Sequence, residues 1–401
     1  MHFKDMEYIN CENMLRCIES ELESPSRTQV AKHLGISNTT ASQIASKLIQ
    51  RKLVRENGSS FTDKRGRPGR KLELNPSYWV ALGASFTSRR FIFVVLNLLG
   101  EMVETFSIRV PDLSLESSME TLRTGLSILI KKYKRRVIPA IGISLPGIVN
   151  PETGVLVRAD DLDWIEVNIG DYIQTHFGKP AYVINRYWAS GLAEYRLVAE
   201  KHIRNFLYIG LGTDIGSAIM INGELVTGQH FSAGKLGHVV IDGNGQICSC
   251  GKKGCLQTVV TQAGLLSHIK EKIEASIGSQ NDDPFINRYL EEGKSIDLDM
   301  LKDMVDASSS IAEEGLEYIG KLLSIAIGNL VQILDPEKIM LGGHLPIKFP
   351  KITEVVQNEL IPHYSEASLD IALSKLGDMG SAIGAAMGVL DRKFALLADK
   401  L

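Results

Sequence analysis

The apolar residues between positions 26 and 50 repeat at helical spacing and predict two short helices joined by a tight turn. Ser26 is a favourable cap for the first helix, and Gly35 can end it. Ser37 or Asn38 can cap the second helix. The residues that would pack the two helices together are Val30, Ala31, Leu34, Ala41, Ile44, Ala45, Leu48 and Ile49. This pattern is typical of a helix-turn-helix, although a two-helix hairpin of a larger bundle shares it.

The polar face of the second helix carries short hydroxyl and amide side chains, which suit contacts to base edges and phosphates in a DNA major groove. We expect Thr39, Thr40 and Gln43 to lie near bases and Lys47 near a phosphate, with Asn38 at the start of the same surface.

A basic segment follows this helix pair. Residues 53–62 predict a two-stranded wing that turns at the Asn57-Gly58 pair, a strong hairpin signal. Beyond it, Arg65, Arg67 and Arg70 alternate with glycine and proline. This composition indicates a flexible basic ribbon that can lie along a minor groove, and it is equally typical of an interdomain linker.

Downstream of residue 80, short apolar runs alternate with helical periodicity, which predicts a mixed α/β sheet covered by helices. Strands are expected at residues 80–85, 91–97, 102–110, 181–184, 206–211 and 217–221, and helices at 117–133 and 188–198. A long apolar helix ends near Asp335-Pro336, and a strand at 338–341 then runs into Gly342-Gly343. Such an order commonly places a ligand at the carboxyl end of the strand.

Charge is divided unevenly along the 401 residues, a length that favours two or three domains. Residues 27–72 hold 11 basic and 2 acidic side chains, or +9, so the net charge of −3 leaves −12 for the remainder. Clustered positive charge suits phosphate contacts and indicates a DNA-binding head on an acidic body; a solvated basic face is the alternative. With no long uncharged apolar run and no apolar core of a signal peptide, we expect a cytoplasmic protein.

Three of the five cysteines lie between residues 237 and 257. His238, Cys248, Cys250 and Cys255 supply one imidazole and three thiolates, which is the ligand set of a closed structural zinc site. Four glycines punctuate the run and allow tight turns. A loop of reduced cysteines without metal is the alternative, and the odd cysteine total argues against a disulfide framework.

With these motifs in hand, the chain resembles the ROK family (repressors, open reading frames and kinases), specifically its longer regulators. The resemblance rests on the helix-turn-helix and on the segments GRPGRKLELNP, GISLPGIVN, LGTDIGSAIMINGEL, LGHVVIDGNGQICSCGKKGCL, ILDPEKIMLGG and GAAMG. It implies a winged helix-turn-helix followed by an α/β, two-lobed, actin-like body of the ribonuclease H type. Such proteins are usually dimeric or tetrameric, and their cleft binds a sugar in many members.

The domains expected on this basis are a winged helix-turn-helix at 1–64, a basic linker at 65–77, lobe 1 at 78–190 and lobe 2 with the zinc loop at 191–401. The C-terminal helix is the element that could return to lobe 1.

Several positions depart from the family kinases. Their catalytic aspartate corresponds to Arg186, which stays protonated and cannot act as a base. Loss of a general base lowers the rate by about 10²- to 10⁴-fold. The first phosphate loop would fall on residues 85–89 and keeps none of its motif, while Asp214 replaces the middle glycine of the second. We therefore expect that the protein does not bind ATP, does not transfer a phosphoryl group and is not an enzyme.

Three carboxylates expected in the sugar cleft are also replaced, by Arg186, Lys235 and Gln257. We hypothesise that Arg186 and Lys235, assisted by Asn185, Gln257 and the second nitrogen of His238, bind an anionic ligand such as a sugar acid or sugar phosphate. The alternative is an unused cleft whose cations pair with acidic neighbours, namely Asp160, Asp161 or Glu194.

Together these features predict an oligomeric DNA-binding regulator, a repressor of carbohydrate-related genes, whose two heads read operator half-sites. Two other functions remain open: a sugar kinase fused to a DNA-binding head, and a regulator that senses a protein partner in place of a small ligand.

Overall fold

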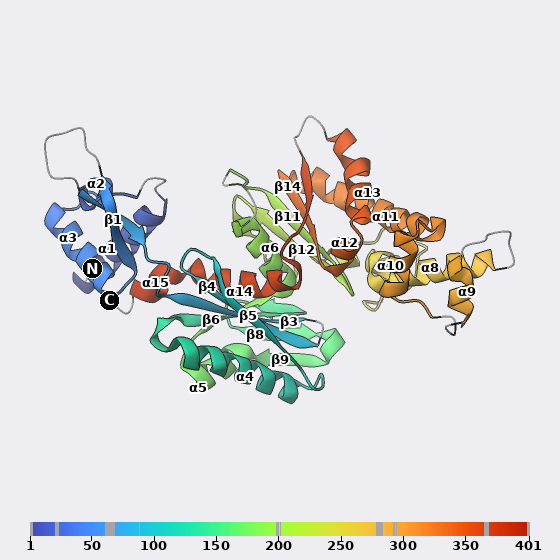
Figure 1. Ribbon diagram of the computed structural model, residues 1–401, viewed down its shortest axis with the longest axis horizontal. Coiled ribbons are helices and arrows are strands. Elements are labelled where there is room, and N and C mark those ends of the chain that lie inside the picture. The colour runs from blue at the N-terminus through green and yellow to red at the C-terminus, as the bar shows by residue number, and fades with distance from the viewer. Residues whose placement is uncertain are drawn as a thin grey trace. The chain divides into compact units, whose positions relative to one another are not determined.

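The computed structural model describes residues 3–20, 24–60, 69–87, 89–197, 200, 202–277, 284–291, 293, 295–364 and 369–398. The chain forms two compact units. Unit 1 comprises Met1–Arg186 and Ala382–Leu401, and unit 2 comprises Tyr187–Ser381. The chain therefore passes from one unit to the other twice, at residues 186–187 and 381–382 (Figure 1).

The head of unit 1 holds three helices and a two-stranded sheet: α1 (Phe3–Ser20), α2 (Arg27–Leu34), α3 (Asn38–Gln50), β1 (Val54–Ser60) and β2 (Gly69–Leu74). Ser26 forms a capping box with Gln29 at the start of α2, and Gly35 ends that helix in the left-handed conformation, with φ 66°. Ser37 caps α3. The two predicted helices and their caps are confirmed.

The wing differs from the prediction. Asn57 and Gly58 lie within β1, which pairs antiparallel with β2, and the register shifts between Asn57 and Ser59. The Asn-Gly pair therefore forms a bulge within a longer strand and not the predicted hairpin turn. Residues 61–68, between the two strands in the chain, lie outside the described residues, and the linker expected at 65–77 overlaps β2.

Lobe 1 completes unit 1 with a five-stranded sheet in the order β10-β6-β3-β4-β5. Its strands are β3 (Val80–Thr87), β4 (Arg90–Asn97), β5 (Met102–Arg109), β6 (Val137–Leu145) and β10 (Ala181–Asn185). β3 runs antiparallel to β4 and parallel to β6. A second sheet of three short strands was not predicted: β7 (Ile148–Asn150), β8 (Val155–Ala159) and β9 (Trp164–Asn168), followed by α5 (Ile169–Phe177).

Two helices cover opposite faces of the five-stranded sheet (Figure 1). α4 (Leu115–Tyr133) packs on Phe93, where a Cβ at Gly125 would lie 2.1 Å from the ring. α14 (Gly380–Leu390) packs on the other face, where a Cβ at Gly83 would lie 2.2 Å from the carbonyl oxygen of Ala382. Only glycine at these positions lets the two helices approach so closely.

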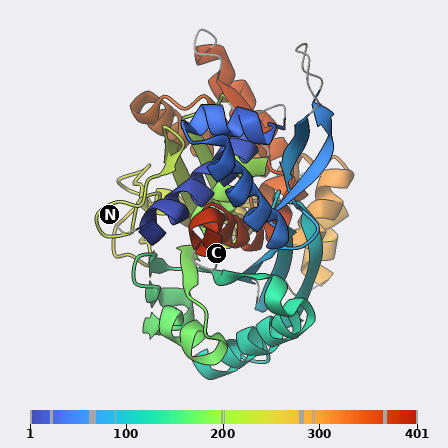
Figure 2. The ribbon, with the colours of Figure 1, turned by 90° about the vertical axis from the view of Figure 1, so that its left-hand side faces the viewer.

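The C-terminal helix α15 (Lys393–Ala398) lies beside α1 of the head (Figures 1 and 2). The ammonium group of Lys393 is 2.6 Å from the carboxylate of Glu19, and the guanidinium of Arg16 lies 6.0 Å from the centre of the Phe394 ring. α14 and α15 thus connect the lobe 1 sheet to the first helix of the head.

Unit 2 repeats the strand arrangement of lobe 1, in the order β13-β12-β11-β14-β15. The strands are β11 (Phe206–Leu211), β12 (Ile215–Ile221), β13 (Glu224–Leu225), β14 (Lys338–Gly342) and β15 (Asp370–Leu373). β11 is antiparallel to β12 and parallel to β14, as β3 is to β4 and β6. The repeated three-strand meander with two added parallel strands is the predicted two-lobed, actin-like fold of the ribonuclease H type.

Helices make up much of the rest of unit 2. α6 (Arg186–Leu197) packs on one face of the sheet, where Gly191 contacts Tyr208 and Ala218. Besides the short α7 (Gln257–Val260), the other α-helices that the structure describes between residues 200 and 370 are α8 (Gln262–Ser276), α9 (Pro284–Glu291), α10 (Leu298–Asp306), α11 (Ser310–Leu334), α12 (His344–Lys348) and α13 (Lys351–Leu360). α11 is long and apolar enough to cross a membrane. Much of its apolar surface, including Ile319 and Leu323, is buried in the unit 2 core against α8 and α13.

Candidate functional site

The polar face of α3 is directed away from the core of the head. Ala41, Ile44 and Leu48 are buried, whereas Thr39 and Gln43 are exposed on the opposite side of the helix. Periodicity places Ser46 and Gln50, both exposed, on the same side. The sequence predicts Ser46 to be exposed on this helix, and Gln50 extends the predicted surface by the same helical spacing.

The other three residues predicted on α3 lie at the margins of this face. Asn38 and Lys47 are exposed. Thr40 is half-buried, its backbone N–H is bonded to the Ser37 hydroxyl at 3.0 Å, and the two hydroxyl oxygens lie 2.8 Å apart. Thr40 therefore takes part in capping the helix.

Arg70 belongs to an ion-pair network at the base of the wing. Its guanidinium lies 2.9 Å from one carboxylate oxygen of Glu56, and the guanidinium of Arg27 lies 2.8 Å from the other. The hydrogen bond from Arg70, assisted by Arg27, holds the pKa of Glu56 below its usual range. The network ties α2 to both wing strands. Arg65 and Arg67 lie outside the described residues.

The head is joined to lobe 1 at an aromatic junction directly after β2. The indole N–H of Trp79 donates to the carbonyl of Arg51, at the end of α3, at 3.0 Å. Arg136 donates to the carbonyls of Tyr78 at 2.8 Å and Ser77 at 2.9 Å. The Tyr78 ring also has the ammonium of Lys52 at 4.7 Å and the guanidinium of Arg136 at 5.6 Å. These contacts fix the end of α3 to lobe 1.

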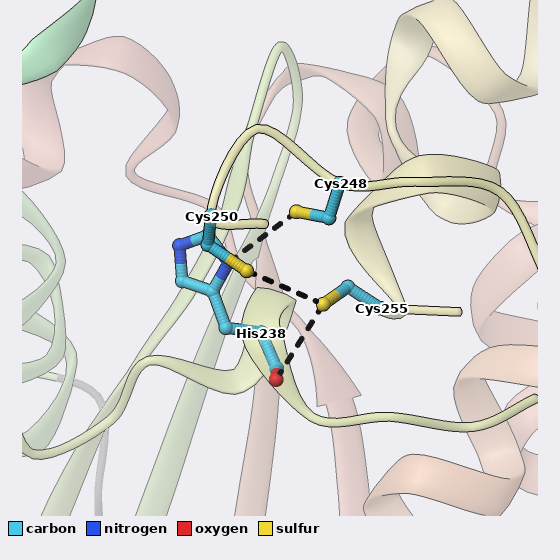
Figure 3. Close-up of side chains that lie close together, drawn as sticks. All are labelled: His238, Cys248, Cys250 and Cys255. Atoms are coloured by element: carbon cyan, nitrogen blue, oxygen red, sulfur yellow. Dashed lines mark hydrogen bonds between the residues drawn. The ribbon is translucent and has the colours of Figure 1, made fainter. Parts of the chain in front are cut away.

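In unit 2, the four predicted metal ligands lie together (Figure 3). The ligand atoms of His238, Cys248, Cys250 and Cys255 are all within 4.8 Å of one another. His238 ends a 3₁₀ turn (Leu236–His238), and Cys255 lies two residues before α7 (Gln257–Val260). Nδ1 of His238 is 3.6 Å from Sγ of Cys248, and Sγ of Cys250 is 3.6 Å from Sγ of Cys255.

Backbone geometry explains how the loop brings these residues together. Gly251 and Gly254 have φ values of 87° and 69°, which other residues rarely adopt. At Gly254, a Cβ would lie 1.5 Å from the carbonyl oxygen of Asp242. An isolated antiparallel β-bridge between Val240 and Cys255 closes the loop.

The chemistry of the donor set fits a cation. Burial acts to raise the pKa of the Cys248 thiol, but hydrogen bonds from Cys250 and His238 outweigh it and lower that pKa to about 6. Burial and the two neighbouring sulfurs raise the pKa of Cys255 to about 12. One thiolate thus opposes ionisation of the next, and a divalent cation would relieve this repulsion. The cluster has the donors of a Cys₃His zinc site.

The five predicted effector residues are divided between the two units. Asn185 and Arg186 lie where unit 1 ends, and the amide of Asn185 donates to the carbonyl of Gly147 at 2.6 Å. Arg186 is half-buried and is the first residue of α6. Lys235, His238 and Gln257 belong to unit 2, and Lys235 is exposed.

Gln257 adjoins the metal ligands. Its side-chain nitrogen lies 3.1 Å from Sγ of Cys248 and 3.3 Å from the hydroxyl of Ser249. Two of the acidic residues considered as partners for the cleft cations are bound elsewhere. Asp160 pairs with Arg158 at 2.8 Å, and buried Glu194 accepts a hydrogen bond from Ser374.

The second phosphate-loop segment is covered by an aromatic ring that sequence reasoning missed. The hydroxyl of Tyr187 donates to the carboxylate of Asp214. A Cβ at Gly210 or Gly216 would lie 2.5 or 2.2 Å from the Tyr187 ring. The signal in the sequence was a pair of glycines inside strands, which often mark a close approach of another group.

The head, the repeated sheets and the cysteine-histidine cluster define a two-lobed regulator fold with a helix-turn-helix. The model of the ROK family matches residues 88–392, more than half of the chain. The chain belongs to the ROK family.

Individual relatives agree with this membership. The chain is 27% identical over 381 residues to a putative xylose repressor of Caldicellulosiruptor sp. (strain Rt8B.4), covering 92% of each chain. It is similar to the crystal structure of a ROK family transcriptional regulator, a homologue of the E. coli MLC protein, with a TM-score of 0.80, 24% identity and 98% of each chain covered.

A ROK family glucokinase from Streptomyces griseus, solved with glucose and AMPPNP, matches 77% of this chain and 98% of its own, with a TM-score of 0.65 and 19% identity. The kinase thus shares the fold of most of the chain, whereas the regulator shares nearly all of it.

Proposed function

We propose that this protein is a DNA-binding transcriptional repressor of carbohydrate-related genes. The observation that carries the proposal is the exposed row on α3, with Thr39 and Gln43 opposite the buried face of the helix-turn-helix. Short polar side chains on such a face suit base edges in the major groove. The match to a putative xylose repressor, over 92% of each chain, supports both the class and the link to sugars.

We propose that the body does not phosphorylate sugars. An arginine stands where the related kinases have their base, and Tyr187 with Asp214 covers the segment expected to hold phosphates. A carboxylate at this position would also repel a nucleotide phosphate. A coupled ATPase assay with a panel of sugars tests this; turnover that depends on a sugar would instead favour a sugar kinase with a DNA-binding head.

The body is proposed to bind one structural Zn²⁺ through His238, Cys248, Cys250 and Cys255. Their convergence supports a closed four-ligand site, which would stabilise the loop and leave no coordination position for catalysis.

The effector is proposed to be an anionic sugar derivative. Arg186 starts α6, so its cation adds to the positive end of the helix dipole, and both favour a negative charge. The hypothesis from the sequence also assigns Lys235, Asn185 and the second nitrogen of His238 to the anion. A thermal-shift screen should show stabilisation by a uronate or sugar phosphate and not by neutral sugars. Equal stabilisation of Arg186→Ala would contradict the assignment.

A cytoplasmic homodimer or homotetramer is proposed as the working state. α11 supports it, because Ile325 and Ile333 are 54% and 77% exposed on a helix whose other face is buried in the core. Such a face suits a two-fold contact between copies. Ile325→Glu should shift the mass measured by light scattering toward the monomer, whereas Glu313→Gln on the same helix should not.

The test of the main proposal is a fluorescence anisotropy titration with double-stranded DNA from upstream of the adjacent genes. Wild type should bind one sequence far more tightly than random DNA, and Gln43→Ala should lose this preference. Equal affinity for all sequences would count against a specific regulator. A pull-down from extract that returns a protein, with no response to sugar derivatives, would favour sensing of a protein partner.

A further inference from the structure

The side-chain amide of Gln257 is directed toward the cysteine cluster. Nε2 of Gln257 lies 3.1 Å from Sγ of Cys248. An amide nitrogen is a hydrogen-bond donor, and a thiolate is an acceptor. The contact is therefore an N–H···S hydrogen bond to one of the proposed zinc ligands.

The surroundings hold the amide in this orientation. The residue starts α7, and its own carbonyl accepts the Thr261 hydroxyl at 2.9 Å, so its backbone is fixed. On the oxygen side, Gly237 leaves room for Oε1: a Cβ there would lie 3.0 Å from that atom. The N–H of Leu256, the preceding residue, donates to the carbonyl of Val239 at 2.9 Å.

Charge explains why an amide suits this position. A divalent cation with three thiolates and one neutral imidazole forms a net negative centre. A carboxylate at the same place would add a second negative charge and no donor, whereas an amide N–H withdraws charge from the sulfur. Partners of metal ligands commonly change metal affinity by about 10- to 100-fold.

We propose that Gln257 is a positioning residue of the metal centre, donating its amide N–H to the Cys248 thiolate, and that it does not belong to the effector site. This inference rests on the proposed zinc site.

The experiment compares full-length wild type with Gln257→Glu, which keeps the size and loses the donor, and with Gln257→Met, which loses the polar group. Gln246→Glu is the matched control, since this glutamine is exposed in the same loop and undergoes the same change of charge. Each zinc-loaded protein is challenged with EDTA, and metal release is followed with a chromogenic chelator. Both Gln257 variants should lose zinc about 10- to 100-fold faster than wild type, and the control should match wild type.

A spectroscopic measurement separates donation to sulfur from a general loosening of the loop. With Co²⁺ in place of zinc, the sulfur-to-metal charge-transfer band should move to longer wavelength in both Gln257 variants, because the sulfur loses an N–H donor. Circular dichroism of each loaded protein checks that it is folded.

The possible outcomes are distinct. Wild-type rates of zinc loss and an unmoved band in both Gln257 variants would overturn the role of Gln257 and leave the zinc site intact. A wild-type protein that retains no zinc would overturn the zinc site itself, and the role of Gln257 with it.

Discussion

The aromatic junction between the head and lobe 1 allows a quantitative test of how firmly α3 is held. Arg136 is the central side chain, because it bonds the carbonyls of Ser77 and Tyr78 from lobe 1. Replacing it by methionine keeps much of the aliphatic length and removes the guanidinium. Arg135→Met is the matched control: Arg135 is the neighbouring, exposed arginine in the described structure.

The magnitude follows from the contacts that are lost. Hydrogen bonds to charged groups contribute about 1.5 to 3 kcal/mol each, and the bond to Ser77 is discounted because it lies in an exposed setting. The cation–π contact with Tyr78 adds about 0.5 to 1 kcal/mol. A net weakening of about 2 to 3 kcal/mol corresponds to roughly 30- to 150-fold more frequent opening of the junction.

Amide hydrogen exchange measures this opening directly. A peptide covering residues 75–80 should exchange about 30- to 150-fold faster in Arg136→Met, while peptides from the unit 2 core exchange as in wild type. DNA affinity should fall much less, because the closed state stays the major one and affinity follows its population. A large change in hydrogen exchange with a small change in DNA affinity is therefore the expected result.

Unchanged exchange at residues 75–80 in Arg136→Met would refute the reasoning, since it would mean that the bonds to Ser77 and Tyr78 do not hold the junction. Equal acceleration in Arg135→Met would also refute it, because loss of a nearby positive charge would then suffice.

Four further results are expected. Gln43→Ala should weaken binding to the preferred DNA sequence by about 1 to 3 kcal/mol, whereas Lys47→Ala should weaken binding to all sequences and reduce the salt slope by about one, both measured by anisotropy over a salt series. Burial raises the pKa of Glu194 above its ordinary value of 4.5, so the folded protein holds this proton more tightly than the unfolded chain does. The protein therefore loses stability as the pH rises above 4.5. Glu194→Gln should raise Tm at pH 8, and this gain should be absent at or below pH 4.5. Gly191→Val should lower the free energy of unfolding by about 1 to 3 kcal/mol in denaturant melts, because a Cβ there would lie 2.3 Å from that of Ala218. Cys255→Ser should lower Tm and abolish the effect of EDTA on Tm, and a variant that still responds to EDTA would argue against the four-ligand site.

Local sequence signals were sufficient for the helix-turn-helix. Ser26, Gly35 and Ser37 act through hydrogen bonds to backbone within a few residues, so their roles follow from the sequence alone. The wing turn could not be placed in the same way. Asn57-Gly58 suits a hairpin turn and a bulge equally well, and only pairing with β2 selects the bulge.

Residues that depend on tertiary contacts were harder to interpret. The metal ligands were predictable because their donor types and spacing restrict the chemistry. The direction of the Gln257 amide was not, since it depends on Cys248 and on the room beside Gly237. Tyr187 was missed because its partners, Gly210 and Gly216, lie on strands that follow it in the chain.

The double crossing between the units also sets an order of assembly during synthesis. Unit 2 is one continuous segment, whereas unit 1 is completed only by residues that follow it. A ribosome therefore makes the helix-turn-helix before unit 2, whereas most of α14, which covers the lobe 1 sheet, and all of α15, which contacts α1, are made after unit 2. While unit 2 is being made, the helix-turn-helix would be attached to a lobe 1 that still lacks α14 and α15. The contact between α1 and α15 would thus form only after unit 2 has been made.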